Sequence, residues 1–423
     1  MFENSLSFAK ELDSTDHLKT YREKFHIPTH QGKELVYLCG NSLGLQPKST
    51  ADYFKQELED WAKWGVEGHF NAKNPWFSYH DWFSSRLAQL VGAHEKEVVA
   101  MNNLTVNLHL LLVSFYRPDG KRNKIIFEST AFPSDRYALE SQVKFHGLNP
   151  EECLVELYAD DNAKISTTSI LNKIKEVGDE LALVMLGGVN YYSGQFFELK
   201  EITKAAHAVG AIAGFDLAHA MGNVPLELHE WNVDFACWCS YKYLNSGPGG
   251  VAGIFVHEKY GDGTGLNRFH GWWGNNAETR FLMGKEFHPA EGAEGWQLSN
   301  APVFNMVAHR ASLELFQEVG MKALREKSIL LTGYLEFLLV EINRELGEEI
   351  IEILTPSNPN ERGCQLSIRV RKDGKKLFEK LVSEGIMPDW REPDVIRLSP
   401  VPLYNRFEDV WRTASVIRSF FIK

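Results

Sequence analysis

The sequence predicts an α/β fold built on a mainly parallel sheet. Two apolar runs, 211–215 and 233–239, have the composition of strands buried on both faces, as parallel strands usually are. Helical segments and polar loops separate such runs, which is typical of a sheet covered by helices on both sides. The first run stops at Asp216 and the second leads to Lys242. Because ligands bind outside the carboxyl ends of such strands, the acid and the lysine should face one crevice.

The elements before this pair follow from the spacing of apolar residues. In residues 51–64, Phe54, Leu58 and Trp61 recur at helical spacing and give the segment one apolar face. Short apolar runs that stop at glycine or polar residues predict strands. On these grounds we expect helices at 7–25, 51–64, 106–115, 135–144 and 198–209, and strands at 34–39, 98–101, 124–128 and 181–186.

The elements after Lys242 begin with a glycine turn and a strand. Residues 261–300 then form a long loop rich in glycine and tryptophan. Loops of this length within a domain are usually functional or lie at an interface. Helices are expected at 303–319 and 321–347, and residues 350–423 have the pattern strand, strand, helix, strand, helix.

Length and composition bound the class of protein. A chain of 423 residues favours two domains, and we expect a large domain at 46–305 and a small α+β domain formed by 1–45 and 306–423. The net charge of −11 argues against nucleic-acid binding, so an anionic cofactor must be held by local groups. No signal peptide or eighteen-residue apolar run is evident, and no membrane contact is expected. Five cysteines, an odd number, suit the reducing cytoplasm, and we expect no metal site.

Residues 40–44, GNSLG, match the G-x-S-x-G nucleophile elbow of α/β-hydrolases. That elbow needs an upstream loop, after a third strand, to complete its oxyanion hole. Only one convincing strand precedes Ser42, so the match is interpreted as accidental. A serine hydrolase acting through Ser42 remains the alternative from a different class of enzyme.

Lys242 and Asp216 together have the chemistry of a pyridoxal phosphate (PLP) site. A lysine amine kept neutral by apolar surroundings is a nucleophile toward carbonyls and the usual anchor for PLP. The same cofactor needs a carboxylate against its ring nitrogen. Either residue alone would more often be a solvated loop lysine or a helix cap. The pair, each member at the end of a buried strand, favours the cofactor.

A phosphate site is expected where the helix 106–115 begins. Asparagine and threonine are common at helix starts, and the free N–H groups there can hold a phosphate without lysine or arginine. Leu104 and Thr105 occupy this position. Simple capping would use the same residues, so this alternative stays open.

Several segments resemble kynureninases, a family of fold-type-I PLP-dependent enzymes. The likeness covers most of the chain, and its motifs occur in the order found in the family. It implies a fold-type-I PLP-dependent transferase-like fold, with a mainly parallel seven-stranded sheet and a smaller α+β domain. It also implies PLP as cofactor and a homodimer whose active site lies at the subunit interface. The motifs are GNSLGLQP, LTVNLHLLL, AFPSD, FDLAHAMGN, VDFACWCSYKYLN, GPGGVAG, RGCQLSI and RLSPVPLYN.

The resemblance also implies roles for individual residues. Lys242 would anchor the cofactor and move the α-proton, Tyr241 would donate a proton in later steps, and Asp216 would pair with the ring nitrogen. The implied cofactor contacts are Leu104, Thr105, Phe132, Pro133, Ser134, Asp135, Asp216, His219, Tyr241, Lys242, Trp272 and Asn300. The implied substrate contacts are Ser42, His69, Asn300 and Arg397. Without the resemblance, residues 132–135 could be a proline turn before a helix, His69 a surface residue, and Arg397 part of a surface ion pair.

The implied reaction is hydrolysis of the Cβ–Cγ bond of L-kynurenine or 3-hydroxy-L-kynurenine. The products would be an anthranilate and L-alanine. His69 and Asn300 favour the hydroxylated substrate, while the pathway, NAD synthesis or tryptophan breakdown, stays open. Within the same fold, a small-amino-acid aminotransferase or a cysteine desulfurase remain alternatives. A desulfurase would need a reactive cysteine on a mobile loop.

Overall fold

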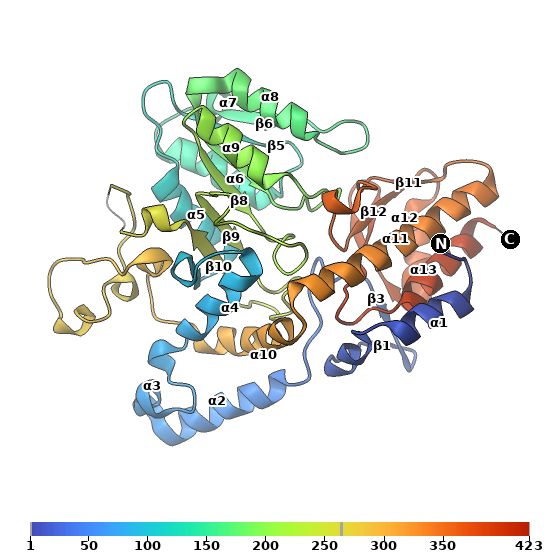
Figure 1. Ribbon diagram of the computed structural model, residues 1–423, viewed down its shortest axis with the longest axis horizontal. Helices are drawn as coiled ribbons and strands as arrows, with labels where there is room; N and C mark the ends of the chain where they lie inside the picture. Colours follow the sequence, from blue (N-terminus) through green and yellow to red (C-terminus); the bar gives the residue numbers. More distant parts are fainter. Residues whose placement is uncertain (1, 263–264, 423) are drawn as a thin grey trace.

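A computed structural model describes residues 2–262 and 265–422 and has a seven-stranded sheet at its centre (Figure 1). Four neighbouring pairs of strands are parallel, whereas β10 is antiparallel to both of its neighbours. The mainly parallel sheet expected from the sequence is therefore confirmed. The strands lie in the order β4 (Val98–Ala100), β10 (Gly253–Val256), β9 (Phe235–Trp238), β8 (Ile212–Asp216), β7 (Leu181–Gly187), β5 (Lys124–Glu128) and β6 (Leu154–Leu157).

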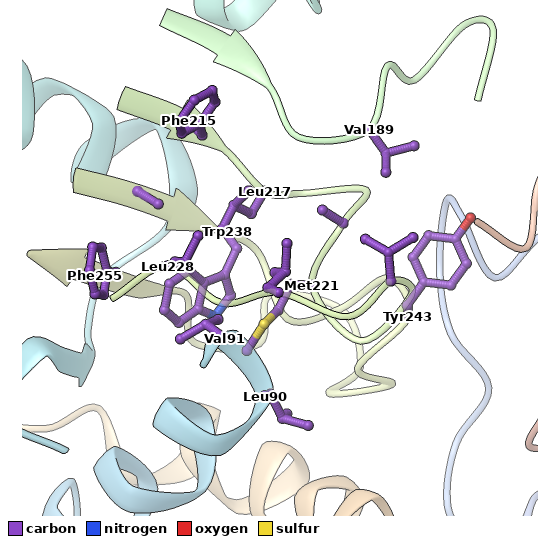
Figure 2. Close-up of a cluster of buried hydrophobic side chains, with 14 of the residues drawn as sticks. Leu90, Val91, Val189, Phe215, Leu217, Met221, Leu228, Trp238, Tyr243 and Phe255 are labelled. Carbon is purple, nitrogen blue, oxygen red and sulfur yellow. The ribbon is translucent and has the colours of Figure 1, made fainter. Parts of the chain in front are cut away.

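Helices bury both faces of this sheet. Along β9, Phe235 and Cys237 point to one face and Ala236 and Trp238 to the other, because side chains alternate along a strand. Figure 2 shows Trp238 beside Val91 on the second face. The first face packs on α5 (Leu104–Phe115) and α6 (Pro133–Phe145). The second packs on α4 (Asp81–Val91), α8 (Thr167–Val177), α9 (Leu199–Ala208) and α10 (Val303–Val319).

A second sheet forms the C-terminal part of the molecule. Its four antiparallel strands lie in the order β11 (Ile351–Ile353), β12 (Leu366–Val370), β15 (Val395–Leu398) and β14 (Asp389–Arg391). The helices α11 (Met321–Leu346), α12 (Gly374–Ser383) and α13 (Phe407–Phe421) contribute to its separate apolar core. Helix α1 (Leu6–Thr15) packs against α13, so both ends of the chain lie on this side of the molecule (Figure 1).

The structure differs from the sequence-based expectations mainly at short elements. The helix expected at 7–25 ends at Thr15, and a separate 3-10 helix follows. The strand expected at 34–39 is reduced to two short pieces, β2 (Lys33–Glu34) and β3 (Val36–Tyr37). Strand β6 and helix α8 were not anticipated, and β13 (Ile386–Met387) and β14 add strands after α12.

Two helices before α4 extend away from the large sheet (Figure 1). Helix α2 (Thr50–Trp64) packs along α10, and the short α3 (Gly68–Asn71) follows at its far end (Figure 1). Residues 261–300 contain only short 3-10 helices in the part that the structure describes. Within the described residues, each helix is too short or too polar to cross a membrane.

Candidate active site

Asp216 and Lys242 meet at the carboxyl edge of the large sheet. Asp216 is the last residue of β8, and Lys242 lies in the loop that follows the neighbouring strand β9. Both side chains line one pocket, together with His219. The Nζ atom of Lys242 lies 3.0 Å from Nε2 of His219, and the carboxylate of Asp216 accepts the N–H of Ala218 at 2.7 Å. The crevice expected from the two strand ends is therefore present.

Three buried carboxyl groups form one side of this pocket. Burial raises the pKa of Glu128 to about 7, although the N–H of Gly187 opposes the shift. Burial also raises the pKa of Asp135, and the facing carboxylate of Asp216 raises it further. For Asp216, burial raises the pKa, while the charge of Lys242 limits the shift. The charge of Lys242 therefore favours the carboxylate form of Asp216, whereas burial and the facing Asp216 both raise the pKa of Asp135.

His219 is held as a neutral imidazole beside the lysine. Burial lowers its pKa well below the usual range, and the positive charges of Lys242 and Arg397 act in the same direction. Its Nδ1 atom is buried and has no hydrogen-bond partner among the described residues. Burial also raises the pKa of Tyr241, so its hydroxyl keeps its proton.

Two helix starts converge on the same pocket. Helix α5 begins at Leu104, which lines the pocket, and α6 begins at Pro133, next to Phe132. The hydroxyl groups of Thr105 and Ser134 are 2.8 Å apart and so join the two first turns. Since each helix start presents unpaired N–H groups and a partial positive charge, the two together suit a phosphate group.

These residues fit PLP. The lysine amine lies 5.9 Å from the ring centre of Phe132, which leaves an aromatic face beside the reactive nitrogen. Asp216 lies in the same pocket, and among the described residues its carboxylate has no hydrogen bond from a lysine or arginine. It can therefore pair with a ring nitrogen. In the described chain, two further buried atoms have no hydrogen-bond partner, Nδ1 of His219 and Oδ1 of Asp135. A polar group of a ligand can bond to them. A planar ring with an aldehyde, a basic nitrogen and a phosphate would satisfy all of them.

The loop at residues 40–47 packs directly on the backbone of Tyr241 and Lys242. The N–H of Gly44 donates to the carbonyl oxygen of Tyr241 at 2.8 Å. A Cβ atom at Gly44 would lie 2.3 Å from the carbonyl oxygen of Lys242, so only glycine allows this approach. Ser42 lies in the turn at the start of this loop, and in the described chain its hydroxyl has no histidine partner. The hydrolase alternative thus lacks its general base.

Arg397 is almost fully buried and contacts Tyr191, one of the residues that line the pocket. It donates to the carbonyl oxygen of Tyr191 at 2.8 Å and to Oδ2 of Asp389 at 2.5 Å. Its Nε atom is buried without a partner among the described residues. Because a guanidinium group has five N–H donors, this pairing leaves donors for a second carboxylate.

His69 and Asn300 lie in a different pocket of the chain. They line it together with Trp61 and Trp76, and this pocket shares none of its described lining residues with that of Lys242. The His69 ring contacts Trp76 edge-on at 5.7 Å. Trp272 is also apart: it is 49% exposed, and its indole N–H donates to the carbonyl oxygen of Arg280. These three therefore lie apart from the Lys242 pocket, and the expected site residues that line it are Leu104, Phe132, Asp135, Asp216, His219, Tyr241 and Lys242.

The five cysteines lack the features of a desulfurase nucleophile. Cys153, Cys237, Cys239 and Cys364 are buried, and burial raises the pKa of each thiol. Cys39 is only partly buried, but burial and the charge of Asp389 raise its pKa to about 12. None of the five is held as a thiolate on an exposed loop.

Some polar residues that line the pocket, or that orient a residue beside it, were missed from the sequence. Tyr191 lines it from the loop after β7, Glu128 ends β5, and Asp389 orients Arg397 from β14. Glu128 follows the same rule as Asp216, since it is a carboxylate at the carboxyl end of a buried strand. That signal could have identified it, whereas Asp389 depends on a strand that was not anticipated.

Comparison with solved structures shows the fold. A C-DES variant with glycine covalently linked to its PLP cofactor superposes with a TM-score of 0.75 at 17% identity, covering 90% of this chain and 96% of that chain. A cysteine desulfurase from Thermococcus onnurineus gives 0.72 at 18% identity, covering 92% and 94%. The fold is thus that of the fold-type-I PLP-dependent transferases, as expected.

Comparison with other sequences shows the family. The model of the kynureninase C-terminal domain matches residues 324–417. The kynureninase of Flavobacterium psychrophilum is 54% identical over 419 residues, which cover 99% of this chain and 98% of the relative. The kynureninase of Myxococcus xanthus is also 54% identical, over 97% and 96%. With such identity along nearly its whole length, this chain belongs to the kynureninase family.

Proposed function

We propose that this protein is a PLP-dependent hydrolase that cleaves the Cβ–Cγ bond of L-kynurenine and 3-hydroxy-L-kynurenine. The products are anthranilate, or 3-hydroxyanthranilate, and L-alanine. Family membership supports the reaction. The observation that carries it in this chain is the pocket shared by Lys242, His219 and Asp216.

The residues of this pocket divide the proton chemistry among them. When bound, PLP supplies an electron sink for negative charge that develops on the amino-acid substrate. Asp216 would hold the proton on the ring nitrogen, because the charge of Lys242 favours its carboxylate form. Lys242 would take the α-proton at Nζ. The neutral His219 at 3.0 Å orients that amine without competing for its proton.

Tyr241 and Arg397 complete the proposed roles. Tyr241 adjoins the lysine and keeps its hydroxyl proton, so it can donate that proton to a substrate carbon or oxygen in a later step. Arg397 would bind the substrate α-carboxylate through the N–H groups that Tyr191 and Asp389 leave free. Ser42 would lie near the substrate, at the start of the loop that packs on Lys242.

Replacement of Lys242 tests the proposal directly. Purified Lys242→Ala protein should lose turnover of both substrates by at least about 1000-fold and lose the visible absorbance of the lysine-bound cofactor. Lys259→Ala, in which a lysine far from the pocket is removed, should retain both properties. An active, yellow Lys242→Ala protein would refute the assignment. Release of a keto acid, rather than alanine, by the wild type would indicate an aminotransferase instead.

We also propose a homodimer in which His69, Trp272 and Asn300 complete the active site of the partner subunit. Within one chain these residues lie apart from the Lys242 pocket, and Trp272 is half-exposed. His69 and Asn300 would contact the aromatic end of the substrate and accommodate its 3-hydroxyl group.

Mixing two inactive variants tests this arrangement. Lys242→Ala and Asn300→Ala proteins, unfolded and refolded together in equal amounts, should form hybrids with one intact site. Half of the dimers are then hybrids, so the mixture should recover roughly one quarter of wild-type turnover. Lack of recovery in a mixture that does form dimers would mean that Lys242 and Asn300 of each site come from the same subunit.

The domain division and the compartment are further parts of the proposal. We propose a large domain at 46–305 and a small domain formed by 1–45 and 306–423. The separate apolar core around α11, α12 and α13, which includes Val36 and Leu38 from the N-terminal segment, supports this division. The five free cysteines support a reducing compartment such as the cytoplasm.

A further inference from the structure

A cluster of histidine and glutamate side chains lies at the amino edge of the large sheet, opposite Lys242. Its members come from three segments: just before β4, between β8 and β9, and just after β10. The antiparallel β10 brings its end beside the starts of β4 and β9. The amino-edge cluster consists of His94, Glu97, His229, His257 and Glu258.

One fully buried carboxylate organises this cluster. Glu97 accepts the backbone N–H of His94 and the backbone N–H of Glu258, each at 2.8 Å. The Nδ1 atom of His229 lies 3.0 and 3.1 Å from its two oxygens. Glu97 therefore positions three residues from three segments, and each of these carries a side chain that can bind a metal.

The contact with Glu97 also sets the chemistry of His229. Nδ1 of His229 faces the two carboxylate oxygens of Glu97. Nε2, on the other side of the ring, is therefore the atom that can bind an ion. Metal-binding histidines in proteins almost always donate their other ring N–H to a carboxylate or carbonyl group in this way.

We infer that His94, His229 and Glu258 bind a divalent transition-metal ion of the Zn²⁺ class. One ligand atom from each of the three lies within 4.8 Å of the others. Two imidazoles and one carboxylate are a common protein ligand set for zinc, and water can occupy the remaining position. Bonds to zinc bring neighbouring ligand atoms to about 3.4 Å in tetrahedral geometry, so the set must contract by about one ångström.

The two outer ligands can make that movement once their own contact opens, since Nδ1 of His94 lies 3.0 Å from Oε2 of Glu258. The His94 side chain is 54% exposed and that of Glu258 is 34% exposed, whereas His229 is held by Glu97. His94 already lies against His229, with ring centres 3.9 Å apart. A turn of the exposed His94 ring would direct its lone pair at the ion that Nε2 of His229 binds.

An ion at this site must displace the lysine that already pairs with Glu258. Nζ of Lys96 lies 3.4 Å from Glu258 and 3.6 Å from Glu291, in an ion pair that water screens. The flexible side chain of Lys96 can move away from Glu258 without leaving a buried charge unpaired, because this ion pair is partly exposed. The overlapping set of Glu97, His229 and His257 is less suited, because backbone N–H groups already occupy both oxygens of Glu97.

Titration of the holoenzyme with zinc tests the site. Wild-type protein, dialysed against a chelator and then against buffer, should bind one Zn²⁺ per chain by calorimetry. His94→Ala and Glu258→Ala should weaken binding at least tenfold, as should His229→Gln. His146→Asn, which removes an exposed histidine elsewhere, should bind like the wild type. Equal affinity in the wild type and His94→Ala would overturn the proposal, as would loss of binding in the His146→Asn control.

Thermal unfolding supplies a second readout that does not depend on turnover. Because an ion that binds only the folded state stabilises it, Zn²⁺ should raise the unfolding midpoint of the wild type. His94→Ala and Glu258→Ala change exposed side chains, so they should fold and retain turnover but show no such rise. An equal rise in these variants would place the ion elsewhere, for example at the Lys242 pocket, and would contradict the inference.

Discussion

At the scale of single residues, the two facing aspartates of the Lys242 pocket have different surroundings although both are buried. The charge of Lys242 favours the carboxylate form of Asp216, whereas burial and the facing Asp216 both raise the pKa of Asp135. An asparagine side chain resembles a protonated carboxyl group but cannot replace a carboxylate. The same substitution should therefore have unequal effects at the two positions.

Asp216→Asn should lower kcat/KM about 10- to 100-fold, because the ring nitrogen loses a charged hydrogen-bond partner worth about 1.5–3 kcal/mol. Asp135→Asn should cause a several times smaller loss. Steady-state kinetics with L-kynurenine, in protein saturated with PLP, compares the two variants. Equal losses would show that the negative charge is not confined to Asp216.

Glu128 should make folding stability depend on pH. Burial raises its pKa from 4.5 to about 7, so the folded state binds a proton that the unfolded state releases between these values. Its favourable contribution is thus complete below pH 4.5 and is lost as pH rises through 7. Glu128→Gln stays neutral, and at pH 8 it should be more stable than the wild type by up to about 3 kcal/mol.

Unfolding midpoints of the apoprotein at pH 5 and pH 8 measure this difference. The gap between Glu128→Gln and the wild type should be small at pH 5 and wide at pH 8. Glu23→Gln, at an exposed position, should follow the wild type at both values. A gap that does not change with pH would mean that Glu128 is ionised throughout.

The sequence predicted the location of a charged residue where that residue ends a buried strand. Asp216 and Lys242 were expected in one crevice for this reason. The pairing of Arg397 with Asp389 could not be foreseen, because it depends on the register between β14 and β15. The different pKa shifts of Asp135 and Asp216 could not be predicted from the sequence either, because they arise only when these two distant side chains face each other.

At the scale of elements, the loop at residues 40–47 supports the lysine from behind. Gly44→Ala would place a methyl group against the carbonyl oxygen of Lys242 and against Asn245, so the backbone must shift. Such overpacking costs about 1–3 kcal/mol and would also move the catalytic amine. The variant should have a lower unfolding midpoint together with a lower kcat.

Gly284→Ala is the matched control for this substitution. A Cβ atom at Gly284 would meet no described atom within 4 Å, and its φ is not in the left-handed region. Circular dichroism and steady-state kinetics should therefore give wild-type values for it. If Gly44→Ala behaved in the same way, the loop would not be packed on Lys242.

Long apolar elements were predicted better than short ones. Helix α10 and strand β5 have the expected bounds, because apolar spacing and burial agree along their length. Strand β6 was missed since it lies at the sheet edge and is only partly buried, which weakens its apolar signal. The two-residue strands β3 and β13 pair only with each other, from positions far apart in the chain.

At the scale of the whole molecule, the N-terminal segment is fastened to α11 by a buried ion pair. Lys327 Nζ lies 2.7 Å from Asp16, and both side chains are less than one-tenth exposed. Lys327→Met should reduce the free energy of unfolding by about 3–5 kcal/mol, because it leaves the carboxylate buried without its counter-charge. Denaturant unfolding measures the loss.

A double variant separates the ion pair from simple packing. Asp16→Asn with Lys327→Met removes both charges and should recover part of the lost stability. Lys322→Met, at an exposed position of the same helix, should be close to neutral. No recovery in the double variant would indicate that the lysine stem, rather than its charge, holds the segment.

The contacts of Arg397 and Asp13 join parts of the chain that are made at very different times. Arg397 donates to Tyr191 across 206 positions, and the carboxylate of Asp13 accepts the N–H groups of Phe407 and Glu408 across almost the whole sequence. A ribosome must therefore release nearly the entire polypeptide before the pocket can close. Until then the N-terminal helix lacks the surface of α13 on which it docks.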